Sequence, residues 1–106
     1  MEERTYLTVT ALNKYIEKKF LLDPYLSEIY IKGEISNLKL HNNNNMYFSI
    51  KDENTRINTV WFGAKNLEFK NGDTVLIKSK VNFYFPRGEY NLLVMDIRKD
   101  RIGELY

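Results

Sequence analysis

The sequence predicts a mainly β fold, a small closed barrel of five strands preceded by an N-terminal helical segment. Three observations support this fold class. Five strand-like runs are separated by turn signals, residues near the N-terminus recur at helical spacing, and Gly33 interrupts the first and longest run. A glycine inside a strand marks a bulge or a bend, and a sheet that closes on itself needs such a bend.

The helical segment is expected at about residues 8–27. Its apolar residues recur at steps of three and four: Val9, Leu12, Ile16 and Phe20. Thr8 is suited to the N-cap, because its hydroxyl can accept a backbone N–H of the first turn. A second short helical turn is expected at Asp23-Pro24, a capping residue followed by proline at the first helical position. We expect this segment to plug one end of the barrel.

The barrel is expected at about residues 28–99, followed by a tail over residues 100–106. Its strands are predicted over residues 28–40, 46–51, 56–62, 74–84 and 90–97. In the second strand Met46, Phe48 and Ile50 alternate with polar or amphipathic residues, so this apolar set is expected in the core. In the third strand we expect Val60 and Phe62 to face the core. Trp61 is then expected on the outer face, beside Tyr47 of the second strand.

The order of the elements favours one barrel type. Three strands, a short connector at residues 63–69 and two further strands are typical of a Greek-key barrel of the OB type. An SH3-like barrel is the nearest competing architecture. The irregular connector favours the OB barrel, which usually carries a helix at that place. The chain of 106 residues is therefore interpreted as a single domain.

Composition excludes several classes of function. The chain has no cysteine and one histidine, and its acidic residues show no metal-ligand spacing, so neither a metal site nor a catalytic site is expected. We do not expect this chain by itself to be an enzyme or to hold a cofactor. No run is long enough to span a bilayer and no leader is recognised, so no membrane association and a cytoplasmic location are expected.

The distribution of aromatic and basic residues indicates a binding surface. The net charge of +2 says little, but aromatic residues make up 14% of the chain, more than one small core needs. OB barrels bind single strands on the face of strands two and three, between two loops. The residues expected there are Lys39, His41, Tyr47, Lys51, Trp61, Tyr84 and Arg87. Stacking on an exposed ring is worth roughly 1–3 kcal/mol per base, and cations neutralise phosphates.

Each of these residues also has an ordinary structural interpretation. Tyr47 and Tyr84 could be half-buried ring edges, and a tryptophan such as Trp61 is more often a packing residue than a stacking platform. His41 could be a solvated loop residue. Arg87 has the strongest case for function, because the preset turn at Pro86 and Gly88 holds its cation clear of the barrel.

Two long runs resemble a known family. GEISNLKLHNNNNMYFSIKDE at residues 33–53 and GDTVLIKSKVNFYFPRGEYNL at residues 72–92 resemble the N-terminal domain of the large subunit of bacterial exodeoxyribonuclease VII. The opening helix, YLTVTALNKYIEKKF, also resembles the start of that family. The resemblance implies an OB fold that binds single-stranded DNA, with the hydrolytic centre in a later domain and several small subunits on a long helical region. The complete enzyme of this family cuts single-stranded DNA from both ends into oligonucleotides.

The resemblance also extends the set of expected contacts. The family pattern falls on Tyr90, and Asn45 stands where the family often has histidine, while Asn44 replaces a glycine. With these additions the expected DNA-binding residues are Lys39, His41, Asn45, Tyr47, Lys51, Trp61, Tyr84, Arg87 and Tyr90. The expected partners are single-stranded DNA, the catalytic remainder of the large subunit and the small subunits. The rival hypothesis is a protein-interaction domain whose exposed rings dock another part of the same assembly.

Overall fold

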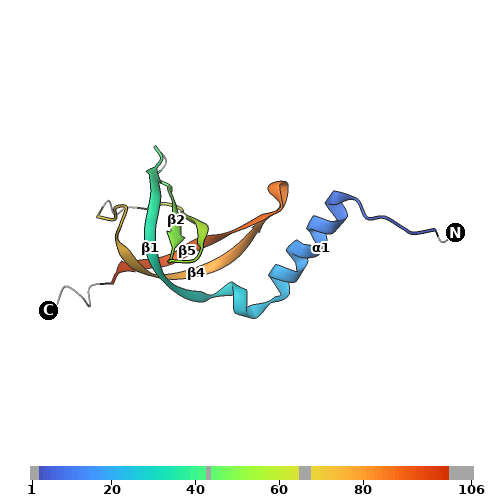
Figure 1. The fold of residues 1–106 in the computed structure, drawn as a ribbon, viewed down its shortest axis with the longest axis horizontal. Coiled ribbons are helices and arrows are strands. Elements are labelled where there is room, and N and C mark those ends of the chain that lie inside the picture. The colour runs from blue at the N-terminus through green and yellow to red at the C-terminus, as the bar shows by residue number, and fades with distance from the viewer. Residues whose placement is uncertain (1–2, 43, 65–67, 101–106) are drawn as a thin grey trace.

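Five strands close into a barrel in the computed structural model, which describes residues 3–42, 44–64 and 68–100 (Figure 1). The strands are β1 (Ile29–Leu40), β2 (Met46–Lys51), β3 (Arg56–Trp61), β4 (Thr74–Tyr84) and β5 (Glu89–Lys99). They follow the order β1-β2-β3-β5-β4 around the barrel. The β3–β5 pairing is parallel and the other four are antiparallel. The predicted fold class, a five-stranded barrel after a helical segment, is confirmed.

The long first strand bends because it changes partner. Its first half pairs with β4 and its second half with β2, and Glu34 has a partner in both. A Cβ on Gly33 would overlap the Ile50 side chain and lie 3.1 Å from the Lys51 carbonyl oxygen, so glycine is needed here for space. Of the bulge or bend predicted at this glycine, the bulge lies further along, between Ser36 and Lys39, where Asn37 has a φ of 52°.

The barrel interior is filled by apolar side chains. Fully buried ones come from β1, β2, β4, β5 and the connector, and Ile57 and Trp61 of β3 pack against them. The buried cluster consists of Ile35, Met46, Phe48, Ile50, Ala64, Phe69, Val75, Ile77 and Ile97. The predicted inward set of β2 is confirmed. The predicted connector at residues 63–69 lies partly outside the described residues. Its described members Ala64 and Phe69 are buried and extend the core.

The prediction for the two faces of β3 is wrong. Residues directly opposite each other in an antiparallel pair share a face of the sheet. Met46 lies opposite Trp61, so Trp61 faces inward, and its ring meets the Phe69 ring edge-on at 5.9 Å. Val60 lies opposite Tyr47 on the outer face, where it is nonetheless buried, at 8% exposed. Phe62, just beyond the strand, is 59% exposed.

The turn between β2 and β3 holds this register. The Asp52 carboxylate accepts the N–H groups of Asn54 at 2.8 Å and Thr55 at 3.0 Å. These hydrogen bonds hold the pKa of Asp52 below its ordinary value. Apolar residues occur on both faces of β3, so the alternation in the sequence could not decide which face is buried.

The helical segment forms where it was predicted. Helix α1 (Val9–Leu22) begins after Thr8, whose hydroxyl accepts the Ala11 N–H at 3.0 Å. The short 3-10 helix η1 (Pro24–Ser27) follows, and the Asp23 carboxylate caps it by accepting the Tyr25 N–H at 2.9 Å. Both caps were predicted from the sequence.

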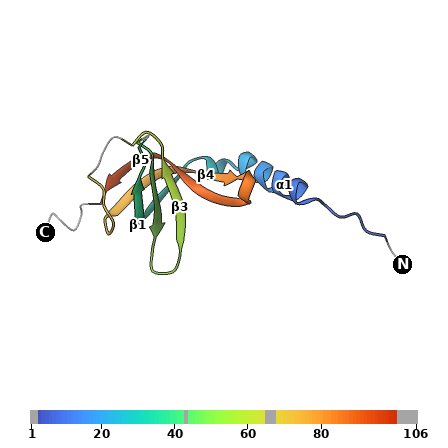
Figure 2. The ribbon, with the colours of Figure 1, turned by 90° about the horizontal axis from the view of Figure 1, so that it is seen from above.

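The helical segment does not plug the barrel, so that prediction is wrong. Strands β4 and β5 have eleven residues each against six in β2 and β3, so their far ends project beyond the barrel. We call this projection, residues 82–91 with the 3-10 turn η2 (Phe85–Arg87), the β4–β5 arm. Helix α1 lies beside the arm and outside the barrel (Figures 1 and 2). The Phe20 ring lies 5.4 Å from the Phe83 ring and 6.1 Å from the Tyr90 ring.

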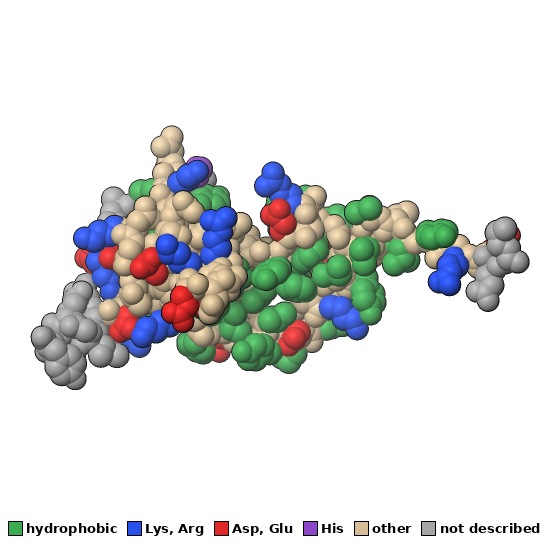
Figure 3. Space-filling view, in the orientation of Figure 1, with side chains coloured by type: hydrophobic (Ala, Val, Ile, Leu, Met, Phe, Trp, Pro, Cys, Tyr) green, Lys and Arg blue, Asp and Glu red, His purple; other side chains and the backbone are tan. Residues whose placement is uncertain are grey.

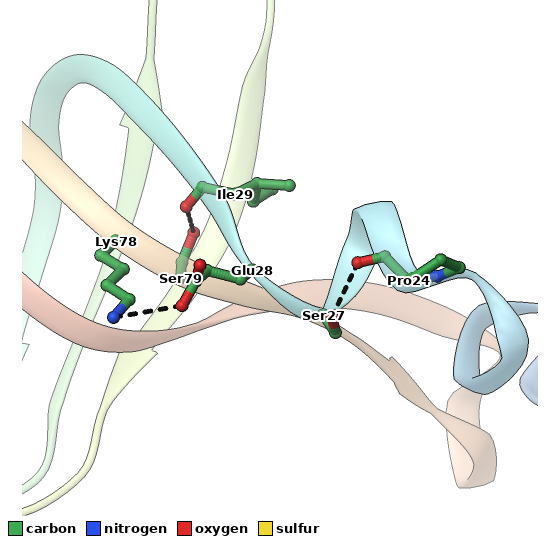
Figure 4. A network of polar contacts seen from close by, with 6 residues as sticks. All are labelled: Pro24, Ser27, Glu28, Ile29, Lys78 and Ser79. Atoms are coloured by element: carbon green, nitrogen blue, oxygen red, sulfur yellow. Dashed lines mark hydrogen bonds and ion pairs between the residues drawn. The ribbon is translucent and has the colours of Figure 1, made fainter.

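Polar contacts fix the junction between η1 and the barrel (Figure 4). The Ser27 hydroxyl donates to the Pro24 carbonyl at 2.7 Å, which closes η1. Glu28 forms an ion pair with Lys78 at 3.1 Å, and the Ser79 hydroxyl donates to the Ile29 carbonyl at 3.5 Å. These contacts tie the start of β1 to β4, so the direction in which η1 leaves the barrel is set.

Candidate nucleic-acid interface

An open groove of about 750 Å³ lies between the outer face of β2–β3 and the β4–β5 arm. The arm can form a wall because the β3–β5 pairing covers only Thr59 with Leu92 and Val60 with Leu93. The groove is lined by Asn37, Lys39, Tyr47, Phe48, Ser49, Arg56, Asn58, Thr59, Val60, Phe62, Asn82, Tyr84, Arg87, Glu89, Tyr90, Asn91 and Leu93. Its rings, cations and amides come from different strands, so only the closed barrel assembles them.

Aromatic rings stand on both sides of the groove. Tyr47 rises from β2 and is half-buried, and the His41 ring meets it edge-on at 4.6 Å between centroids. Tyr84 is 47% exposed on the arm, and Phe62 follows β3. Such rings offer flat apolar surface to a planar ligand.

Three cations line the groove, and each comes from a different element. They are Lys39 of β1, Arg56 of β3 and Arg87 of η2. Among the described residues, none of the three forms an ion pair, and Glu89 is the only acidic residue in the lining. The groove therefore carries an excess of positive charge, which favours an anionic ligand.

A tight turn presents Arg87. Gly88 has a φ of 63° in the left-handed region, which suits glycine, and its N–H donates to the Tyr84 carbonyl at 3.0 Å and the Phe85 carbonyl at 3.2 Å. The cation therefore stands at the tip of the arm, as the sequence Pro-Arg-Gly predicts.

Asparagine amides complete the lining. They are Asn37, Asn58, Asn82 and Asn91. The Asn82 side-chain N–H donates to the Asn91 side-chain oxygen at 3.2 Å across the two strands of the arm. An amide carries both donors and acceptors, so this lining can bind the edges of heterocyclic bases as well as phosphate oxygens.

The structure places six of the predicted residues at or against the groove, counting Tyr90 at its edge. Lys39, Tyr47, Tyr84 and Arg87 line it, and His41 supports the Tyr47 ring. The sequence reasoning missed Arg56, Asn58, Phe62 and the Asn82–Asn91 pair. Polar residues alternating along β3, β4 and β5 were a usable signal for the asparagines, whereas Phe62 was assigned to the core.

Three other predicted residues lie away from the groove lining. Trp61 packs against the core, which corrects its expected place on the outer face. Lys51 lies on the outer face at the far end of β2, where it forms an ion pair with Glu34 at 3.3 Å. The Asn45 side chain accepts the Gly63 N–H at 3.1 Å, so it holds the loop against the barrel.

Tyr90 borders the groove from the opposite face of the arm. It lies directly opposite Phe83 in the β4–β5 pairing, and its ring approaches Phe20 of α1. Two cross-strand pairs of the arm face the groove: Asn82 with Asn91, and Tyr84 with Glu89. Tyr90 therefore packs toward the helix and contributes only to the edge of the groove.

A second hollow of about 530 Å³ lies on the outer face of β1, β4 and β5. It also combines a tyrosine with cations: Tyr30, Lys32, Lys78 and Arg98. Here Lys32 forms an ion pair with Asp100 at 3.0 Å, and Lys78 with Glu28 at 3.1 Å. Asp96 also lines this hollow, so its charges are largely balanced.

Two kinds of feature do not occur in the part of the chain that the structure describes. In residues 3–42, 44–64 and 68–100 no three or more histidine, aspartate and glutamate residues gather as they would around a metal ion. In the same residues no helix is long and apolar enough to span a membrane.

Comparison with known sequences identifies related proteins. The model of the family described as OB-fold nucleic acid binding domain matches residues 7–98. The chain is 44% identical over 110 residues to the exodeoxyribonuclease 7 large subunit of Bacillus subtilis (strain 168), with 100% of this chain and 25% of that protein covered. It is 45% identical over 108 residues to the protein of the same name from Bacillus mycoides (strain KBAB4), with 98% and 24% covered. The predicted resemblance is confirmed, and the chain spans about a quarter of the length of these curated relatives.

Solved structures share the fold at low sequence identity. A replication protein A heterotrimer bound to single-stranded DNA has a chain that superimposes with a TM-score of 0.62 at 13% identity, covering 76% of this chain and 64% of that one. A putative aspartyl-tRNA synthetase from Leishmania major Friedlin superimposes with a TM-score of 0.58 at 10% identity, covering 93% and 21%. Both likenesses concern the barrel architecture.

Proposed function

The chain belongs to the family of OB-fold nucleic acid binding domains, and from this premise we propose that its groove binds single-stranded DNA. The observation that carries the proposal is one groove with exposed rings and three cations that have no ion pair among the described residues. Bases would stack on Tyr47 and Tyr84, while Lys39, Arg56 and Arg87 would contact phosphates.

The groove favours single strands for a physical reason. A ring can stack on a base only where that base is unstacked and turned out of a helix, as in a single strand. Each stacked base contributes roughly 1–3 kcal/mol, without demanding a particular sequence. The Asn82–Asn91 pair would then bind the base edges that a duplex hides between its strands.

The related proteins support DNA as the ligand. Their name, exodeoxyribonuclease, describes an activity on DNA. We propose that this chain is the DNA-binding region of an exodeoxyribonuclease VII large subunit, whose complete enzyme degrades single-stranded DNA from both ends into oligonucleotides. Hydrolysis would reside in the remainder of that subunit, and small subunits would complete a cytoplasmic enzyme. DNA binding by this region would need no cofactor.

Fluorescence anisotropy of labelled oligonucleotides tests the ligand class. We expect a thymidine oligomer to bind the 106-residue chain more tightly than a duplex of equal length. The affinity should fall as salt increases, because bound phosphates release counterions. Equal affinity for duplex, or no dependence on salt, would contradict the proposal. An RNA oligomer of matched sequence decides whether the groove prefers DNA.

An NMR titration with the same oligomer tests the location. We expect the largest chemical-shift changes at the amides of Tyr47, Tyr84 and Arg87, around the groove. Tyr30 and Lys32 in the second hollow serve as internal controls and should not shift. Shifts confined to the second hollow would place the ligand elsewhere and overturn the assignment of the groove.

A further inference from the structure

One side of α1 carries an apolar stripe on which the described chain packs nothing. Leu12, Tyr15 and Leu22 are 45%, 58% and 68% exposed, and none of the α1 residues, all of which are described, is buried. With Lys19 these residues recur at steps of three and four, so they share one face of the helix. Figure 3 shows hydrophobic side chains gathered over the helical half of the molecule.

The other side of α1 already has its partner. Phe20 packs against the arm, and Asn13 lies close to the turn at Gly88. Glu17 lines a small cleft between α1 and β4, together with Lys80. Because these contacts seat the helix, the stripe is not needed to hold α1 on the barrel. Contiguous exposed apolar side chains rimmed by charged residues mark interaction sites.

The charges around the stripe have one sign. Helix α1 carries three lysines, Lys14, Lys18 and Lys19, and its single acidic residue is Glu17. Lys14 lies over the Phe85 ring of the arm at 5.4 Å, and Glu17 lies in the cleft on the barrel side. The open side of α1 therefore carries Lys18 and Lys19 and no acidic residue of this helix. Lys19 lies over the Tyr15 ring at 5.1 Å and is therefore part of the stripe.

We propose that this stripe docks an amphipathic α-helix of a partner protein, whose own apolar stripe is flanked by aspartate and glutamate. The spacing of Leu12, Tyr15, Lys19 and Leu22 is that of a seam between two helices. Acidic residues beside the partner's stripe would meet Lys18, which flanks the seam, and Lys19 within it, as charged flanking positions do in paired helices.

Two other occupants fit these observations less well. A second copy of this chain would bring the lysines of two stripes together, and like charges at a helix pair oppose association. A helix that lies on a membrane keeps its cations on the polar face, opposite its apolar face. Here Lys19 lies within the stripe itself, over the Tyr15 ring. The surface is distinct from the groove, so its test does not depend on DNA binding.

Titration with two designed helical peptides tests the proposal. Both have a leucine stripe at heptad spacing; one has glutamate and the other lysine at the flanking positions. We expect the glutamate peptide to shift the NMR signals of Leu12, Tyr15 and Leu22 and to bind at least about tenfold more tightly than the lysine peptide. The double variant Leu12→Gln with Leu22→Gln should lose at least about tenfold in affinity for it.

Matched controls distinguish docking on the stripe from non-specific hydrophobic binding. Met95 of β5 is 52% exposed, comparable to Leu12, so Met95→Gln should leave peptide binding unchanged. Circular dichroism checks that the double variant retains α1, and DNA binding should be unaffected. Failure of the glutamate peptide to bind, equal binding of both peptides, or shifts away from α1 would overturn the proposal. So would a dimer in sedimentation equilibrium that Leu12→Gln dissociates, or binding to phosphatidylglycerol vesicles in preference to the peptide.

Discussion

The groove and the second hollow have similar ingredients but differ in how their charges are satisfied. Each combines an exposed tyrosine with three cations on the outer wall of the barrel. In the second hollow Lys32 and Lys78 form ion pairs at 3.0 and 3.1 Å. Within the described residues, the cations of the groove have no such partners. Composition alone would assign both surfaces the same role.

The difference indicates which cations are available to a ligand. A cation that already neutralises a carboxylate must give up that interaction before it can bind a phosphate, whereas an unpaired cation exchanges only water and counterions. The groove also has asparagine amides, which the second hollow lacks. Its arm projects as a wall, because only two residues of β5 pair with β3. Variants of the two surfaces can test whether these differences govern binding.

Removing the cations of the groove should have the largest effect. The variant combines Lys39→Ala, Arg56→Ala and Arg87→Ala. We expect its affinity for a thymidine oligomer to fall by about a hundredfold, because the phosphates no longer have their counter-charges. The slope of log affinity against log salt should become shallower by roughly 2, since each phosphate neutralised by a cation contributes about 0.7 to that slope. Anisotropy titrations at several salt concentrations measure both quantities.

The matched control removes the cations of the second hollow. It combines Lys32→Ala, Lys78→Ala and Arg98→Ala, so the change in net charge is the same. We expect affinity and salt slope to stay close to those of the unchanged chain. Similar decreases in affinity in both variants would mean that total charge, and not the groove, governs binding.

Trp61 allows the contribution of a core residue to be compared with that of the groove residues. Its ring packs on Phe69 inside the barrel, so Trp61→Ala should lower the free energy of unfolding by about 3 kcal/mol. DNA affinity of the folded protein should stay within about twofold, since the side chain does not line the groove. Urea unfolding and anisotropy under folding conditions measure the two effects. If the Trp61→Ala variant kept its stability but bound DNA weakly, Trp61 would belong to the DNA-binding surface.

One tyrosine of the groove and one of the second hollow provide the next comparison. Tyr84→Ala should reduce affinity by about 5- to 150-fold, which corresponds to the roughly 1–3 kcal/mol of one stacked base. Tyr30→Ala removes a ring that is even more exposed, at 73%, and should leave affinity unchanged. Anisotropy titrations compare the two. An equal decrease in both variants would argue against a single stacking surface.

The smallest effect concerns the ion pair of the second hollow and depends on pH. The hydrogen bond and charge of Glu28 raise the pKa of Lys78 above its ordinary value of 10.5. Because the pKa of Lys78 is higher in the folded state, its protonated form stabilises the fold. This stabilisation is fully present below about pH 10.5 and disappears as the pH rises through the folded-state pKa. Lys78→Gln should therefore be slightly less stable than the unchanged chain at about pH 8, with a smaller difference at about pH 11. Thermal unfolding at the two pH values measures it, and a difference that grows with pH would contradict this account.

Local sequence signals were sufficient for most of the elements. Thr8 and Asp23 cap their helices as expected, because a cap is a contact between residues two or three positions apart. Predicted strands 46–51 and 74–84 coincide with β2 and β4, whose alternation is clean on one face. Gly33 marked the bend correctly, although its role is to give space to Ile50.

The errors occurred where two distant segments meet. Trp61 and Phe62 exchanged faces because β3 has apolar residues on both sides, and only its pairing with β2 decides between them. The helix was expected to plug the barrel, and of its predicted apolar residues Phe20 does pack, although against the arm and not against the barrel end. The helix instead lies beside the β4–β5 arm, which forms because β4 and β5 are long enough to extend beyond the barrel.

The sequence by itself determined the family, the helix, the order of the strands and the residue types available for binding, since these depend on motifs and on neighbours along the chain. The tertiary structure decided which cations remain unpaired, which rings face solvent and which side of α1 stays open. Those properties depend on pairing between strands such as β1 with β4 and β3 with β5. Contacts between residues so far apart in the chain leave no local pattern from which to read them.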